Sequence, residues 1–167
     1  MDIRIRESRP EDFQALWRLD QECFVRGISY SKKELGWYMK MKGAFTLVAE
    51  PAISTEPTAI EKQSGKTKAA PGVAGFIVAQ DLGKGMGHVV TIDVQPQLRR
   101  TGVGLKLMQA AEQRLQGEGC HTIYLETAVD NDTAIRFYKR LSYFVLKVIP
   151  RYYLNRIDAL LLAKRLG

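Results

Sequence analysis

The chain has 167 residues, of which 46% are hydrophobic and 26% charged. This length and composition predict one globular domain, residues 1–167, that is large enough to bury a core. Its net charge of +7 can favour phosphate-rich partners, but the basic residues are scattered and form no nucleic-acid motif. We therefore expect no specific nucleic-acid partner.

The cysteines and the N-terminus point to a reducing compartment. Cys23 and Cys120 lie far apart and belong to no CxxC or metal-type spacing, so we expect neither a disulfide framework nor a metal site. The first residues alternate charged and apolar types, and no segment has the apolar length needed to cross a bilayer. A cytoplasmic protein without a membrane partner is the simplest interpretation.

The N-terminal part predicts a strand and two helices. Ile3 to Arg6 alternates apolar and charged residues, as a half-buried strand would. Ser8-Arg9-Pro10-Glu11 has capping-box spacing with an early proline, and the helix that it opens should end by Gly27. Ser31-Lys32-Lys33-Glu34 repeats this pattern and opens a second helix, which Gly43 should close.

The middle of the chain predicts strands interrupted by an insertion. The residue pattern of Ala44 to Glu50 predicts a strand. Pro51 to Gly72 holds three prolines and almost no large apolar residue, so we expect a flexible hairpin insertion. Val73 to Gln80 and His88 to Val94 should continue the same sheet after it.

The C-terminal part alternates helices and strands. Apolar residues at helical spacing, closing glycines and an Asn-Asp-Thr cap predict the following elements: a helix over Leu105–Gln116, a strand over Ile123–Val129, a helix from Asn131 to about Leu141, and strands over Tyr143–Ile149 and Asp158–Lys164. The order βααβββαβαββ indicates an α/β protein with one sheet and helices against it.

A glycine-containing turn joins the strand ending at Val94 to the next helix. Gly102 and Gly104 let the backbone approach an anion, and the helix N-terminus offers unpaired N–H groups. The turn lacks the Gly-Lys-Ser/Thr ending of a P-loop and the third glycine of a dinucleotide fold. Without further context, the two glycines could also serve a tight turn alone.

The run Arg99-x-x-Gly102-x-Gly104 after a strand resembles the [QR]xxGx[GA] signature of the GCN5-related N-acetyltransferase (GNAT) superfamily. The order of elements also agrees with that family, whose fold is a single mixed, mostly antiparallel sheet. The resemblance implies that acetyl-CoA binds here. Its pyrophosphate would contact the backbone of Arg99, Arg100, Thr101, Gly102, Val103 and Gly104, and its pantetheine arm would lie along Ile92, Asp93 and Val94.

Two residue types suited to amine acetylation follow the turn. A carboxylate such as Glu126 can accept a proton from an ammonium, and a phenol such as Tyr138 can donate one to a departing thiolate. Taken alone, Glu126 could be an exposed strand residue and Tyr138 a core aromatic. His88 and Asp93 are rival bases on the preceding strand, although His88 also suits a structural role.

The segment from Leu125 to Tyr138 is similar to ribosomal-protein-alanine N-acetyltransferases. This resemblance implies that Glu126 is the proton acceptor, Tyr138 the proton donor and Asn131 a coenzyme A contact. The chain departs from that family after the helix, where Leu141-Ser142-Tyr143 replaces Leu-Gly-Phe.

The segment Ile149-Pro150-Arg151-Tyr152-Tyr153 is similar to the tyrosine-pair hairpin of N-terminal protein acetyltransferases. The resemblance implies that Tyr152 and Tyr153 line the slot for the first residues of the acceptor. Both could equally be ordinary strand aromatics. Tyr30, between the first two helices, is a further candidate for this slot.

These observations predict an N-acetyltransferase that moves acetyl from acetyl-CoA to the N-terminal α-amine of a protein, of the ribosomal-protein type. One alternative keeps the cofactor but acetylates a small amine such as a polyamine, an amino sugar or an amino acid. Another is a non-catalytic basic protein that binds the ribosome or RNA.

Overall fold

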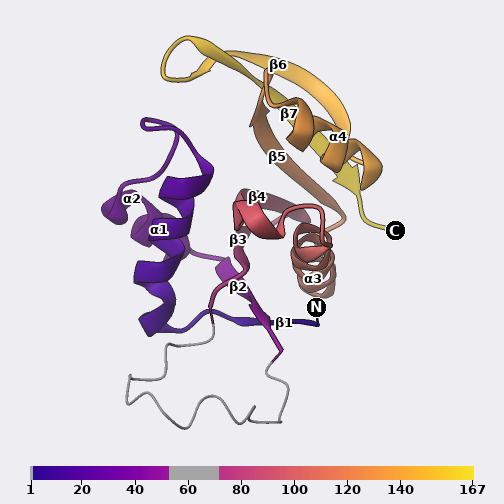
Figure 1. Ribbon diagram of the computed structural model, residues 1–167. Coiled ribbons are helices and arrows are strands. Elements are labelled where there is room, and N and C mark those ends of the chain that lie inside the picture. The colour runs from indigo at the N-terminus through magenta and orange to yellow at the C-terminus, as the bar shows by residue number, and fades with distance from the viewer. Residues whose placement is uncertain (1, 53–71) are drawn as a thin grey trace, which may run out of the picture.

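The computed structural model describes residues 2–52 and 72–167 (Figure 1). One seven-stranded sheet runs through it, with the strand order β1-β2-β3-β4-β5-β7-β6. The predicted order βααβββαβαββ is confirmed. The insertion expected over residues 51–72 falls almost entirely on residues 53–71, which lie outside the described residues, while Pro51 itself belongs to β2.

The elements have the following bounds. The strands are β1 (Ile3–Glu7), β2 (Ala44–Pro51), β3 (Gly75–Asp81), β4 (Met86–Val94), β5 (Thr122–Ala128), β6 (Phe144–Tyr153) and β7 (Ile157–Arg165). The helices are α1 (Phe13–Cys23), α2 (Lys32–Met39), α3 (Val103–Gly117) and α4 (Asp132–Arg140), with short 3-10 turns at Pro10–Asp12 and Pro96–Leu98.

The two N-terminal helices begin by different local interactions. The capping box at Ser31 is confirmed, since Ser31 N–H donates to Glu34 Oε2 over 2.8 Å and Glu34 N–H donates to Ser31 Oγ over 3.2 Å. The capping box expected at Ser8 is wrong. There the carboxylate of Asp12 accepts from Arg9 N–H over 2.7 Å, and a 3-10 turn precedes α1.

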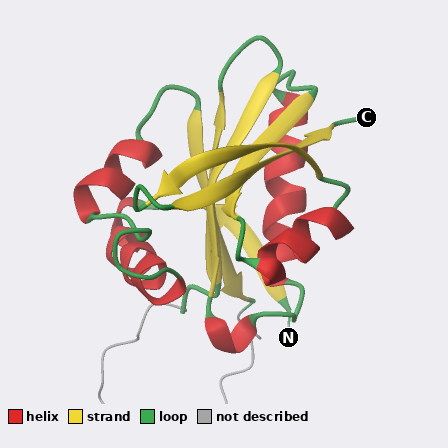
Figure 2. Cartoon of the chain, turned by 90° about the horizontal axis from the view of Figure 1, so that it is seen from above, coloured by secondary structure: helices red, strands yellow, loops and turns green. Residues whose placement is uncertain are grey.

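The helices cover both faces of the sheet, as Figure 2 shows from above. On one face, Leu16 and Leu35 of α1 and α2 pack against Phe76 and Val78 of β3. On the other face, residues of α3 and α4 share a core cluster with the alternate residues of β3. Because successive strand residues point to opposite faces, the buried sequence of β3 supplies both cores.

A β-bulge in β4 opens the centre of the sheet. Val78 pairs with Thr91 and Ala79 with Val89, so that Val90 is an extra residue in β4. Bulges bend the strand that carries them. The parallel pairing of β4 with β5 ends at His88 and Tyr124, and the remainder of β4 pairs with β3 alone. Among the described residues, no strand therefore pairs with the β5-facing edge of β4 from this point to Val94.

The C-terminal hairpin is longer than predicted. β6 continues from Ile149 to Tyr153, and Tyr153 pairs with Ile157 across a short turn. The hairpin arches over the end of the sheet beside β5 and α4 (Figure 1). Within the described ranges, no helix is long and apolar enough to cross a membrane.

Candidate active site

Glu126 lies at the point where β4 and β5 separate. It follows Tyr124 by two residues, so it lies on the same face of the sheet as Tyr124 and His88, which are paired across the strands. The Nε2–H of His88 donates to Oε2 of Glu126 over 2.7 Å, and the two side chains are 19% and 14% exposed. The Tyr124 ring stacks on the imidazole at 4.6 Å between centroids. His88 thus holds one oxygen of the predicted base.

The sequence indicated His88 and Glu126 as competing candidates, whereas the structure joins them in one pair. Their contact depends on the register of two strands that are 38 residues apart in sequence. Strand alternation predicts the face on which each side chain lies, but a parallel register cannot be obtained from one sequence. No local signal could have identified the pair.

Two phenol groups of the C-terminal hairpin lie near Glu126 of this pair. Burial raises the pKa of Tyr152 to about 12, and the nearby charge of Glu126 adds to the rise. Burial also raises the pKa of Tyr153, with smaller effects from Tyr152 and Glu126. A raised pKa keeps a phenol protonated, so both residues present neutral hydroxyl groups near the carboxylate of Glu126.

Tyr30 reaches the same place from the connection between α1 and α2. Its ring lies 5.0 Å from that of Tyr38, centroid to centroid. Burial raises the pKa of Tyr30 and the neighbouring phenols add to the rise; these neighbours are Tyr38, Tyr152 and Tyr153. The three predicted acceptor residues therefore lie together, with Tyr38 as a fourth member. We call this group of four the tyrosine wall.

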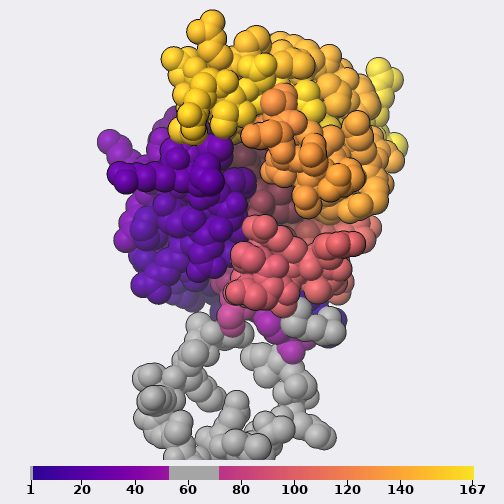
Figure 3. All heavy atoms as spheres, turned by 45° about the horizontal axis from the view of Figure 1, so that its top comes forward, coloured from indigo at the N-terminus to yellow at the C-terminus, as the bar shows by residue number. Residues whose placement is uncertain are grey.

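Figure 3 shows a hollow between the N-terminal helices, the C-terminal hairpin and the segment that carries β5 and α4. The tyrosine wall comes from the first two of these parts, and Glu126 belongs to the third. The elements around this hollow are therefore the ones that carry the predicted base and acceptor residues.

Tyr138 lies on α4 and its side chain is buried in the core cluster that this helix shares with α3. Burial raises the pKa of its hydroxyl, and the charge of Asp93 adds to this effect. At the start of the same helix, Asn131 is the N-cap of α4, where its Oδ1 accepts from Ala134 N–H over 3.2 Å. Asn131 therefore has a structural task beside the coenzyme A contact that the resemblance implies.

The predicted anion turn has the backbone geometry of a cradle. Gly102 is the N-cap of α3 with φ 94°, and Arg100 is also left-handed with φ 64°. The first helical hydrogen bond runs from Lys106 N–H to the Gly102 carbonyl over 3.0 Å. The amides of Val103 and Gly104 precede it and have no partner within the helix. A phosphate would meet these N–H groups and the positive end of the helix dipole.

Two side chains of the turn donate hydrogen bonds to backbone carbonyls that precede it. Arg99 Nε donates to the Val94 carbonyl over 3.3 Å, and Thr101 Oγ1 donates to the Leu98 carbonyl over 2.6 Å. The Arg99 side chain thus folds back onto the end of β4. At Gly104, an added Cβ would lie 3.3 Å from the Phe137 ring, so a side chain there would press on α4. The backbone of the turn, with both glycines, fits a pyrophosphate.

The strand beside this turn holds three residues predicted to follow the pantetheine arm. Ile92 and Val94 are half-buried, and Asp93 is 1% exposed. Oδ2 of Asp93 accepts from Thr91 Oγ1 over 3.2 Å, whereas Oδ1 has no hydrogen-bond partner among the described residues. Burial raises the pKa of Asp93 well above its usual range, and the charge of Asp20 adds to this. Its enclosure favours Glu126 over Asp93 as the base.

Asp20 of α1 is a second enclosed carboxyl group, with 0% of its surface exposed. Oδ2 accepts from Tyr30 N–H over 2.7 Å and from Gln21 Nε2 over 3.1 Å. Burial raises the pKa of Asp20 to about 6, although these two hydrogen bonds oppose the rise. Asp20 lies on the buried face of α1 with Leu16 and Leu19, and its partner Tyr30 lies in the loop beyond the helix.

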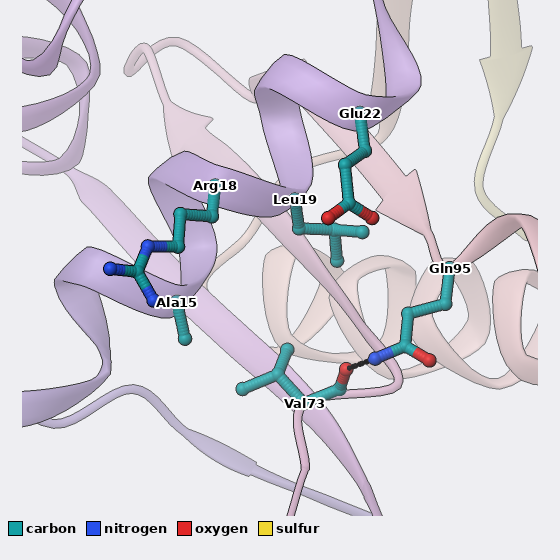
Figure 4. Close-up of a pocket in the computed structure, with 6 residues that line it drawn as sticks. All are labelled: Ala15, Arg18, Leu19, Glu22, Val73 and Gln95. Carbon is teal, nitrogen blue, oxygen red and sulfur yellow. Dashed lines mark hydrogen bonds between the residues drawn. The ribbon is translucent and has the colours of Figure 1, made fainter.

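Two further hollows lie elsewhere. One of about 180 Å³ lies beside α1 and is lined by Ala15, Arg18, Leu19, Glu22, Val73 and Gln95, and Figure 4 shows the Gln95 amide donating to the Val73 carbonyl. The other, of about 390 Å³, is lined by His121, Thr122, Arg165 and Leu166. Neither contains a predicted site residue. In the described part of the chain, no group of three metal-ligating side chains comes together.

A sequence profile of the Acetyltransferase (GNAT) family matches residues 13–143. The chain belongs to this family. N-alpha-acetyltransferase 30 of Schizosaccharomyces pombe is 36% identical over 90 residues, which are 52% of this chain and 60% of the relative. The chain spans about half the length of the curated relatives that it matches.

Solved structures agree with the GNAT fold. Ard1 from Thermoplasma volcanium has a TM-score of 0.81 at 23% identity, covering 100% of this chain and 99% of that one. A chain of the NatC complex bound to Gag peptide and CoA has a TM-score of 0.76 at 25% identity, covering 100% of both chains. The predicted GNAT fold is therefore confirmed.

We predict that Gly102→Ala weakens the binding of coenzyme A to this GNAT domain. A side chain at φ 94° strains the left-handed residue that turns the amides toward the anion. We expect the Kd for coenzyme A, measured by calorimetry, to rise about tenfold. The matched control is Gly117→Ala in α3, where an added Cβ meets nothing within 4 Å. Equal Kd values for both variants and the wild type would contradict the assignment of the turn.

We also predict that Asp20→Asn stabilises the fold more at pH 7.5 than at pH 4. The raised pKa of about 6 means that the folded state keeps a proton that the unfolded chain releases near pH 4. Stability is therefore lost as the pH rises from about 4 to 6, by roughly 2 to 3 kcal/mol at about 1.4 kcal/mol per pKa unit. Asparagine does not titrate and avoids this loss.

Urea unfolding at the two pH values measures this difference, with the exposed Asp130→Asn as control. A stability difference between Asp20→Asn and the wild type that does not depend on pH would count against the raised pKa.

Proposed function

We propose that this GNAT domain transfers acetyl from acetyl-CoA to the N-terminal α-amine of a protein. The observation that carries the proposal is the Glu126–His88 pair at 2.7 Å, at the opening of the sheet and beside the tyrosine wall. A carboxylate held by an imidazole suits proton transfer from an amine. Two features of the fold, the cradle at Gly102 and the open edge of β4, supply the donor side.

Acetyl-CoA, when bound, supplies the acyl thioester. The backbone amides of Val103 and Gly104 would hold its pyrophosphate, with Gly102 shaping the turn. The edge of β4 at Ile92 to Val94, which lacks a pairing strand on the side of β5, would hydrogen-bond with the amides of the pantetheine arm. These contacts need only backbone groups of the turn and of β4. The side chain of Arg99 is therefore not needed for them and can hydrogen-bond with the Val94 carbonyl.

Two side chains transfer protons in this proposal, and a third orients one of them. Glu126 accepts a proton from the acceptor ammonium, and His88 keeps the carboxylate oriented toward it. The amine nitrogen then bonds to the thioester carbonyl carbon, the carbon–sulfur bond breaks, and Tyr138 donates a proton to the departing thiolate. Its raised pKa keeps Tyr138 protonated until that step. Overall, an ammonium and a thioester give an amide, a thiol and one proton released to solvent.

A protein N-terminus is the proposed acceptor because the tyrosine wall offers apolar faces with polar tips to an extended peptide. The similarity to N-alpha-acetyltransferases and to a NatC chain bound to a peptide supports this choice. A ribosomal protein is the finer proposal, carried by the resemblance of the segment from Leu125 to Tyr138. The free thiols of Cys23 and Cys120 suit a cytoplasmic setting.

We predict that Glu126→Gln lowers kcat/KM for the acceptor by about 10² to 10⁴-fold, the usual contribution of general base catalysis. His88→Gln should cause a smaller loss, because glutamine can still donate to Glu126. Steady-state kinetics across pH 6 to 9 provide the measurement, and coenzyme A affinity should remain unchanged. The control is Glu118→Gln on the surface. Wild-type kinetics in Glu126→Gln would exclude Glu126 as the base.

The acceptor class requires a separate test. We expect acetyl-CoA turnover on short peptides with a free α-amine to exceed turnover on a panel of polyamines, amino sugars and amino acids by more than tenfold in kcat/KM. Acetylation of the same peptides should stop when the α-amine is blocked. Faster turnover on a small amine would show that the acceptor is a small molecule and not a protein N-terminus, while acetyl-CoA would remain the acetyl donor. Salt-sensitive RNA binding without any acetyl transfer would overturn the enzyme proposal.

A further inference from the structure

The main chain of Tyr30 is held on both sides by α1. Its N–H donates to Asp20 Oδ2 over 2.7 Å. Its carbonyl accepts from Trp17 Nε1 over 3.1 Å and from Gln21 Nε2 over 2.8 Å. Residues three and four apart share one face of a helix, so the three side chains converge on one loop residue. We call Trp17, Asp20 and Gln21 the Tyr30 clamp.

The Tyr30 clamp supplies the hydrogen bonds that regular secondary structure would otherwise give to the connection between α1 and α2. This connection spans residues 24–31 and contains only turns and bends. Such a segment is normally the most mobile part of a fold, because few of its backbone groups are paired. At Tyr30, however, both backbone groups are satisfied by side chains of a rigid helix. The position of Tyr30 is therefore set by α1.

The use of Asp20 to hold Tyr30 lowers the stability of the fold, because its carboxyl group must be buried. Its carboxyl group is fully buried, its Oδ1 has no hydrogen-bond partner among the described residues, and the like charge of Glu34 raises its pKa further. Burying a carboxylate under these conditions opposes folding. A strong hydrogen bond to the loop is the compensating interaction, since bonds to charged acceptors are shorter and stronger than neutral ones.

The residue fixed by the clamp belongs to the proposed acceptor site. The Tyr30 ring packs on Tyr38 and lies near Tyr152 and Tyr153 of the hairpin. The same loop approaches the hairpin at Gly27, where an added Cβ would overlap the Leu154 side chain. A displacement of Tyr30 would therefore change one side of the hollow without reaching the turn at Gly102.

We infer that Asp20 is a positioning residue for the acceptor: through the Tyr30 main chain it fixes the tyrosine wall opposite Glu126. This inference rests on the proposed function, because the wall matters only if an acceptor binds there. It predicts a change in acceptor KM without a change in acetyl-CoA KM. A purely structural role would lower stability and leave both constants unchanged.

The chain offers a matched control in Asp12. This carboxylate is also buried, and it accepts from Arg6 Nη1 over 2.7 Å and from Arg9 N–H over 2.7 Å. It lies at the other end of α1, away from Tyr30. Asp12→Ala should therefore destabilise the fold through the same helix without moving the acceptor wall.

The experiment compares Asp20→Ala, Asp20→Asn and Asp12→Ala with the wild type in the full chain. For Asp20→Ala we expect the KM for an acceptor peptide to rise about tenfold, as for the loss of a hydrogen bond to a charged group, with the acetyl-CoA KM within twofold. Asp20→Asn retains an acceptor oxygen for Tyr30 N–H and should recover most of this loss. Hydrogen exchange at the Tyr30 amide should accelerate in Asp20→Ala and not in Asp12→Ala.

If Asp20→Ala does not fold, Trp17→Phe takes its place, since it removes one donor to the Tyr30 carbonyl and should raise the acceptor KM about threefold. Wild-type turnover with an unchanged acceptor KM in these variants would overturn the inference about Asp20 alone. A wild-type chain that acetylates no amine would overturn the proposed function and, with it, the acceptor role of Asp20.

Discussion

The separation of β4 from β5 is the constraint on which the rest of the site depends. The two strands pair only from Met86 to His88, and the extra residue Val90 then bends β4 away. An open edge inside a sheet leaves backbone groups without partners, which is costly unless a ligand can pair with them. His88 belongs to the last pair of this contact, and its side chain reaches Glu126, which lies two residues beyond Tyr124.

Donor and acceptor functions are divided between backbone and side chains. The turn at Arg99 to Gly104, the proposed pyrophosphate site, presents amides whose direction is fixed by left-handed residues and a helix N-terminus. The proposed acceptor side instead uses aromatic side chains from the N-terminal loop and the C-terminal hairpin. A backbone site recognises the constant chemistry of coenzyme A, whereas a side-chain site can vary with the acceptor.

Each side of the proposed site, donor and acceptor, has a buried carboxyl group next to it. Asp93 lies on the strand beside the cofactor turn, and Asp20 lies on the helix that holds Tyr30. Each has one oxygen without a hydrogen-bond partner among the described residues, and burial raises the pKa of both. Charged residues are normally found outside the core, but these two are buried in it. Such exceptions are expected at functional positions, for example where a protein fixes a functional loop.

Resemblance to known families, rather than spacing, put forward Glu126 and Tyr138 as candidates. The sequence by itself determined the order of elements, the capping box at Ser31 and the glycine turn before α3. These features depend on local spacing, which a single chain displays directly. The exact start of α1 escaped prediction, because Asp12 rather than Ser8 caps the chain there. Only the tertiary structure joined His88 to Glu126, gathered four tyrosines from three segments and turned Asp20 toward Tyr30. Strand register and the packing of distant segments decide such contacts, and neither leaves a periodic signal in the sequence.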